Sequence, residues 1–165
     1  MARTLSKTIA ALALASTLPC AACDGGGDSS EDSDSETGSA QVPACVEYEL
    51  EGCAPLYPPS YDQVWNQTLS KGCAEFGTAC HAQEDAAGAL DGMTFVDPQQ
   101  SWDHMLMASE PLVVPGDPLC SELFVRLVSE DPAVRMPPGS GAGLAEGALC
   151  SIGTWIAEGA TYQQP

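Results

Sequence analysis

The chain has 165 residues, of which 23 are acidic and only 5 are basic, and its formal net charge is −18. Nucleic acids and anionic lipid headgroups are bound mainly through Lys and Arg, so this balance excludes both as electrostatic partners. Hydrophobic residues make up 44% of the chain, which is enough for a compact core and argues against a wholly disordered protein.

The N-terminus has the pattern of an export signal. Basic residues precede an apolar run of roughly ten residues, which is too short to span a bilayer but suits a signal peptide. The sequence CAAC at residues 20–23 resembles the lipobox of bacterial lipoproteins, although Cys20 stands where leucine is usual. This resemblance implies a lipoprotein signal peptide at residues 1–22 and lipidation of Cys23. The alternative is ordinary signal cleavage, which leaves Cys23 free in a soluble periplasmic protein.

Residues 23–42 contain mainly Gly, Ser, Asp and Glu and no aromatic side chain. Such a segment cannot bury enough apolar surface to offset its ordering entropy, so we expect a disordered acidic tether. It would link a domain at residues 43–165 to a membrane of the cell envelope, facing the periplasm. An exported chain meets an oxidising compartment, in which disulfides persist.

The sequence after the tether has helical periodicity. Apolar side chains recur at spacings of three and four in four segments, Tyr61–Leu69, Ser101–Met107, Asp117–Val128 and Gly143–Glu158. We expect Ser60 to cap the first helix and Gly159 to end the last one. No stretch is expected to form a strand. The prediction is an all-α domain of four to five short helices that follows an irregular, cysteine-containing lead-in at residues 43–59.

Six cysteines fall within this domain, an even number that favours disulfides in an exported chain. Sequence alone allows about fifteen pairings of six cysteines. One of them joins Cys45 with Cys53, which are close in sequence, and Cys120 with Cys150, which lie on two helices expected to pack together. That pairing leaves the remaining two cysteines, at positions 73 and 80, for each other or for other chemistry.

Cys80 is followed directly by His81, the pair through which proteins attach haem covalently and ligate its iron. The usual motif is C-x-x-C-H, whereas here Gly77 holds the first cysteine position and Cys73 lies further upstream. Met136, followed by two prolines, offers a thioether in a stiff loop as a second axial ligand. A thioether ligand favours ferrous iron and raises the reduction potential.

Residues 73–160 resemble the small c-type cytochrome domains of exported planctomycete and myxobacterial proteins. The resemblance is carried by the segments CH, GALDG, VVPGDPLCSELFVRL, RMPPG and IGTWIAEGA, at residues 80–81, 88–92, 113–127, 135–139 and 152–160. It implies a class I cytochrome c-like all-α fold with haem c attached to Cys80, His81 as proximal ligand and Met136 as distal ligand. It also implies that Trp155 lies in the wall behind the haem and Pro115 in a loop at its edge.

The divergent motif leaves three arrangements open. Cys73 provides a second attachment through a long loop, or haem is attached to Cys80 alone, or the two cysteines form a disulfide and only the fold is retained. The first two predict a lipid-anchored electron carrier, not an enzyme, whose acidic surface attracts a redox partner with a basic surface. The third predicts a haem-free, disulfide-stapled interaction or structural module. His104 is a weaker candidate, as an axial ligand or as a zinc ligand with Cys73, Cys80 and His81.

Overall fold

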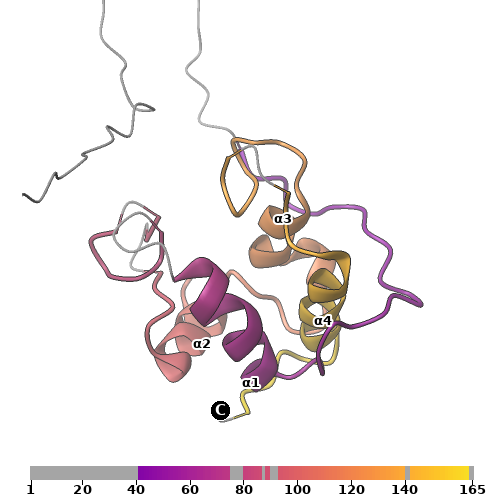
Figure 1. Cartoon of the computed structure of the whole chain (residues 1–165), viewed down its shortest axis with the longest axis horizontal. Helices are drawn as coiled ribbons and strands as arrows, with labels where there is room; N and C mark the ends of the chain where they lie inside the picture. The colour runs from indigo at the N-terminus through magenta and orange to yellow at the C-terminus, as the bar shows by residue number, and fades with distance from the viewer. Residues whose placement is uncertain (1–40, 75–79, 87, 90–92, 140–141, 164–165) are drawn as a thin grey trace, which may run out of the picture. The chain divides into compact units, whose positions relative to one another are not determined.

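The computed structural model describes residues 41–74, 80–86, 88–89, 93–139 and 142–163. These residues form helices joined by irregular segments and contain no strand, so the predicted all-α class is confirmed (Figure 1). The α-helices are α1 (Tyr61–Val64), α2 (Pro98–Met107), α3 (Glu122–Val128) and α4 (Glu146–Ala157). The expected signal peptide, Cys23 and all but the last two residues of the expected tether lie outside the described residues. Among the described helices, none combines the length and the apolar content that crossing a membrane requires.

The first helix is longer than its sequence pattern indicates. α1 passes directly into a π-helix, η1 (Trp65–Cys73), so the helical segment reaches Cys73. Ser60 occupies the N-cap position with an extended backbone, but its side chain makes no capping hydrogen bond. The Asp62 carboxylate instead accepts a hydrogen bond from the Asn66 side chain at 2.8 Å, and its charge lies in the first turn, where the helix dipole favours it. This helix carries Cys73 to the start of the following loop.

An aspartate side chain caps the start of each of the two middle helical segments. α2 starts before the predicted Ser101, because the Asp97 carboxylate accepts the Gln100 N–H at 2.8 Å and proline occupies the first turn. The single helix predicted for residues 117–128 is divided into the short 3₁₀ helix η4 (Pro118–Cys120) and α3.

The division between η4 and α3 occurs at Ser121, which has an extended backbone and is fully buried. Its hydroxyl donates to the Asp117 carbonyl at 2.7 Å and accepts the Val114 N–H at 2.9 Å. Serine hydroxyls compete with helical hydrogen bonding in this way, so a continuous helix is not formed here.

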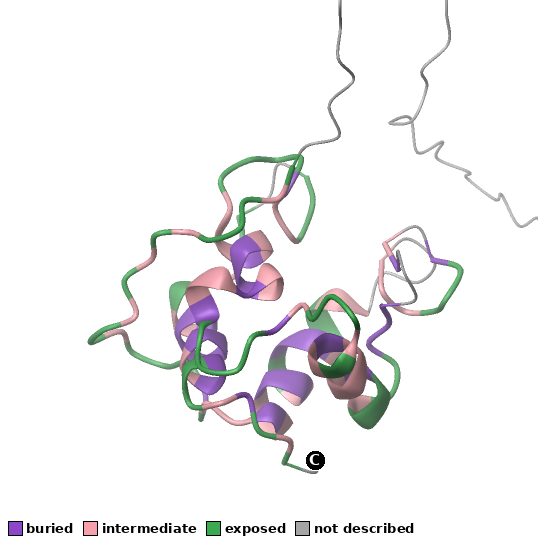
Figure 2. Cartoon of the chain, turned by 180° about the vertical axis from the view of Figure 1, so that it is seen from behind, coloured by how far each residue is buried: buried purple, intermediate pink, exposed green. Residues whose placement is uncertain are grey.

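Helix α4 is the centre of the core and contacts α1, α3 and η4 (Figure 1). Buried residues cover most of its surface, as Figure 2 shows. Its Trp155 is 2% exposed and packs against Tyr61 of α1, with 5.5 Å between the ring centroids. The helix begins at Glu146, not at Gly143 as predicted, and it is followed by Gly159 in the predicted left-handed conformation, with φ of 100°.

Two disulfides fasten the irregular lead-in to this core. Cys45 is bonded to Cys120 of η4, and Cys53 is bonded to Cys150 of α4. The pairing considered from the sequence, Cys45 with Cys53 and Cys120 with Cys150, is therefore wrong. The lead-in brings Cys45 to η4 and Cys53 to α4, so its two cysteines are bonded to different helices and not to each other.

Candidate functional site

The two remaining cysteines lie at the two ends of one loop. Cys73 is the last residue of η1, while residues 75–79, with Gly77, lie outside the described residues. The ends of the loop are close together, because the His81 N–H donates to the Cys73 carbonyl at 3.2 Å. Cys73 and Cys80 are both unpaired and half-buried. The disulfide between them that the sequence left open is therefore not formed, and both thiols remain for other chemistry.

The Cys73 thiol lies in an apolar environment, packed against the hydrophobic core. Burial raises its pKa from the ordinary value of 9.0 to about 11, and the neighbouring Cys80 adds to the rise. The thiol is therefore protonated at neutral pH. A protonated thiol is a poor nucleophile in disulfide exchange, which agrees with its unpaired state.

His81 is held by contacts that orient its ring. Its Nδ1 lies 2.9 Å from the Met93 carbonyl oxygen. Because a carbonyl can only accept, Nδ1 carries the proton, and a neutral ring keeps its free lone pair on Nε2. The Phe95 N–H donates to the His81 carbonyl at 2.8 Å, and the Phe95 ring packs edge-on with centroids 5.1 Å apart. Metal-ligating histidines are oriented by this kind of second hydrogen bond, so Nε2 is prepared to bind a metal.

Met136 follows α3 in a loop that is tied back to that helix. Its N–H donates to the Arg126 carbonyl at 2.8 Å, and its side chain is partly buried against the hydrophobic core. The preceding Val134 is 1% exposed and anchors the same loop. The thioether is thus carried by an ordered backbone and is not one of the fully buried side chains that fill the core.

His81 and Met136 lie in loops that follow different elements. One follows η1, and the other follows α3.

Arg135, beside Met136, has a donor that no described residue satisfies. Its Nη2 donates to the Gly139 carbonyl, which holds the guanidinium within its own loop. Its Nε is buried and has no hydrogen-bond partner in the described part of the chain. A buried, unsatisfied N–H of a charged group costs free energy, so an oxygen acceptor, above all an anionic one, would be stabilised at this position.

The other candidate residues are placed apart from these ligands. His104 lies on α2, and the described residues contain no group of three or more His, Cys, Asp or Glu that could hold a metal ion. The zinc site considered from the sequence therefore has no support. Trp155 is buried against Tyr61, with its Nε1 donating to the Thr161 carbonyl at 3.2 Å. Pro115 lies in an exposed turn before α3.

Three contributors to the site were not found from the sequence. The Met93 carbonyl left no signal, because any residue type can supply a backbone oxygen. Phe95 was recognisable only as an apolar residue after the loop. Arg135 stands directly before Met136. Basic residues are rare in this acidic chain, and a basic residue beside a candidate ligand could have been recognised on that ground.

One family model matches part of the chain. The family model described as planctomycete cytochrome C matches residues 78–140. The matched part includes Cys80, His81 and Met136, and it excludes Cys73. The match supports a cytochrome c-like domain. No curated protein and no solved structure matches the chain.

Proposed function

We propose that the protein is an exported electron carrier with one haem c, attached through Cys80 and ligated by His81 and Met136. The hydrogen bond between His81 Nδ1 and the Met93 carbonyl carries this proposal, because it fixes the tautomer that leaves Nε2 free. The family match over the same residues adds to it. The protein is not proposed to make or break substrate bonds, since a cytochrome c-like domain is typical of an electron carrier.

When bound, a haem c supplies one-electron exchange between ferric and ferrous iron. The residues of the chain orient and tune it. His81 offers Nε2 from a ring fixed by Met93 and Phe95, and Met136 offers a soft thioether that favours the ferrous state. Arg135 supports the proposal separately, because its unsatisfied Nε suits a carboxylate such as a haem propionate.

Cys73 is proposed as the second attachment residue. Its thiol is unpaired, and its backbone is hydrogen-bonded to His81, so the long spacing to Cys80 is closed by the fold. Addition of a thiol to a vinyl group forms one S–C bond and transfers the thiol hydrogen to the neighbouring carbon, so no oxidant is consumed. The family match does not include Cys73, and this favours the alternative in which haem is attached to Cys80 alone.

Export and membrane anchoring belong to the same proposal. Two disulfides in the domain agree with an oxidising compartment such as the periplasm. Lipidated Cys23 would anchor the protein, and residues 24–42 would serve as its tether. Replacement of Cys23 by Ser should move the protein from the membrane fraction to the soluble fraction, and continued membrane partitioning would contradict the anchor.

A second candidate function is a haem-free interaction module on the same fold. The observation that favours it is the core around α4, which is closed by two disulfides and needs no cofactor to be packed. In this case Cys73 and Cys80 would remain thiols, and His81 would only pack against Phe95.

Covalent haem staining separates the two candidates. The chain is expressed for export together with a haem-maturation system, and a denaturing gel and a reduced-minus-oxidised spectrum are recorded. The proposal expects stain in the parent, none in Cys73→Ser/Cys80→Ser or His81→Ala, and full stain in His104→Ala. Cys73→Ser should keep the stain and shift the haem band, because one thioether replaces two. If the parent stays unstained while a control cytochrome in the same system is stained, the electron-carrier proposal is wrong and the haem-free module is favoured.

A further inference from the structure

Residues 46–51, here called the acidic edge, form an extended segment with two different faces. Val46, Tyr48 and Leu50 are half-buried, whereas the three glutamates between and after them are exposed. The Tyr48 ring packs edge-on against Phe124, with centroids 5.3 Å apart. This alternation with a period of two is the pattern of a strand with one face on the core. The segment has no partner strand among the described residues.

The acidic edge is held at both ends by covalent bonds. Cys45 immediately precedes it and is bonded to Cys120, and Cys53 follows it and is bonded to Cys150. Between the two disulfides, Leu50 packs so closely on α4 that a Cβ on Gly153 would lie 2.6 Å from its Cδ2. The segment is therefore pre-organised, and a partner that binds it would lose little free energy in ordering it.

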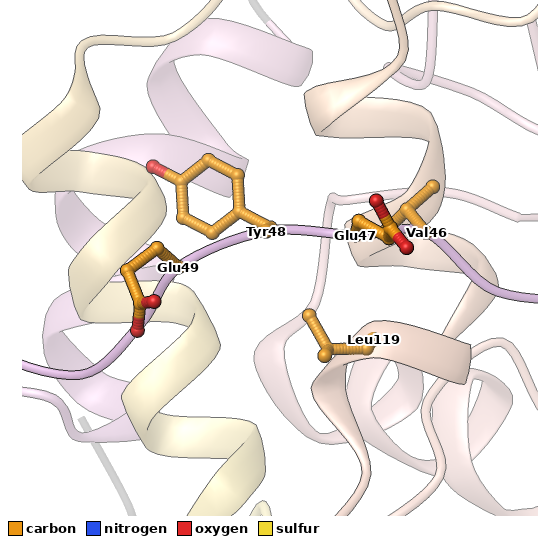
Figure 3. Close-up of a pocket in the computed structure, with 5 residues that line it drawn as sticks. All are labelled: Val46, Glu47, Tyr48, Glu49 and Leu119. Carbon is orange, nitrogen blue, oxygen red and sulfur yellow. The ribbon is translucent and has the colours of Figure 1, made fainter.

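The backbone of the acidic edge is open for pairing. The Val46 N–H donates to the Leu119 carbonyl at 2.9 Å. The next N–H groups, from Glu47 to Leu50, have no partner among the described residues. An open groove of about 480 Å³ runs beside the segment, and Figure 3 shows Leu119 across from it and the Tyr48 ring directed away from Leu119. Unpaired backbone groups beside a groove are the features to which an extended peptide can add as a strand.

We propose that the acidic edge binds an extended, basic segment of a partner protein by strand addition. Charge complementarity selects this occupant, because Glu47 and Glu49 line the groove. A second copy of the chain is a poor occupant. The chain has only three basic residues after the expected tether; Arg126 is paired with Glu122 at 2.8 Å, and Arg135 is bonded within its own loop. The glutamates thus repel copies of the protein and admit a basic strand. The proposal does not depend on haem.

Strand addition is distinguished from plain charge attraction by three labelled peptides. The probe alternates Lys with Thr and Val (KTKVKTK). A charge-reversed peptide (ETEVETE) and a proline peptide (KPKVKPK), which keeps the charge but loses two N–H donors, serve as controls. Binding to the oxidised full chain is measured by fluorescence anisotropy at low ionic strength. The probe should bind, and the proline peptide should bind about tenfold more weakly because two hydrogen bonds are lost.

Protein variants locate the site. Glu47→Lys/Glu49→Lys should weaken the probe about tenfold, whereas the charge-matched Glu110→Lys/Glu130→Lys, at exposed positions elsewhere, should leave it within about twofold. Amide hydrogen exchange on the parent chain should slow at residues 47–50 when the probe is added. Equal binding of the probe and the proline peptide, equal losses in the two double variants, unchanged exchange, or no binding of the probe would each overturn the proposal.

Discussion

The six cysteines of the domain divide the described molecule into two regions with different chemistry. Around η4 and α4, four cysteines are closed into disulfides that fasten the lead-in to the core. At the loop after η1, Cys73 and Cys80 are unpaired although they lie at neighbouring positions. The first region has the cross-links of a small exported domain. Two adjacent thiols kept open beside an oriented histidine are more typical of a site for covalent attachment.

The largest difference in stability between the two regions is expected when their cysteines are replaced. Removal of the Cys53–Cys150 bond by a double Ala substitution should lower the free energy of unfolding by about 4 kcal/mol, because the bond closes a long loop in the unfolded chain. The matched variant Cys73→Ser/Cys80→Ser removes no cross-link and should cost at most about 1 kcal/mol in haem-free protein. Urea unfolding followed by tryptophan fluorescence measures both. Similar losses in the two variants would contradict the division.

A smaller effect is expected where a side chain joins the lead-in to α4. The Ser151 hydroxyl is fully buried, accepts the Tyr57 N–H at 3.2 Å and donates to the Tyr57 carbonyl at 2.8 Å. Ser151→Ala leaves that N–H without a partner and should cost about 2 kcal/mol. Ser70→Ala removes only a bond to the carbonyl of Trp65 within η1 and should cost under about 0.5 kcal/mol. Urea unfolding of both variants measures the two costs. If Ser70→Ala costs as much as Ser151→Ala or more, this prediction is wrong.

The helices could be predicted from local pattern, and their ends could not. Apolar spacing and the proline and glycine signals located all four helical segments, and Gly159 ended the last one as expected. The break at Ser121 depends on a hydroxyl that bonds to residues four and seven positions earlier and that is buried by the tertiary fold. The extension of the first helix to Cys73 likewise depends on a π-helical stretch that propensity does not indicate.

The cysteine pairing and the candidate site show the same limit. Closeness in sequence suggested the bond between Cys45 and Cys53, but an extended chain keeps such neighbours apart and brings them to different helices. Residues 46–51 alternate apolar and acidic side chains, but the segment is extended without a partner strand, so the prediction that no stretch forms a strand is right for it. Cys80, His81 and Met136 could be named from their motifs. The fixed tautomer of His81 could not, because it depends on the position of the Met93 carbonyl.

Among these predictions, the Cys73 thiol should change the stability at neutral pH the least. The pH at which this thiol loses its proton tests directly whether the region of Cys73 and Cys80 is shielded from solvent. Burial raises its pKa to about 11, so the folded state disfavours the thiolate. Well below pH 9 both the folded and the unfolded chain keep this proton, and stability should not depend on it. From pH 9 to about 11 the unfolded chain releases the proton first, so stability should fall as the pH rises.

Alkylation with iodoacetamide, mapped by peptide mass spectrometry in haem-free protein, should therefore label Cys73 slowly at pH 8 and rapidly only near pH 11. The same residue in urea should react with a midpoint near 9, which supplies the control for burial. Cys80→Ser should lower the folded midpoint slightly, because the neighbouring cysteine makes the smaller contribution to the raised pKa. A folded midpoint equal to that in urea would show that Cys73 is open to solvent. The two thiols would then lack the protected environment that distinguishes their region from the disulfide-bonded one.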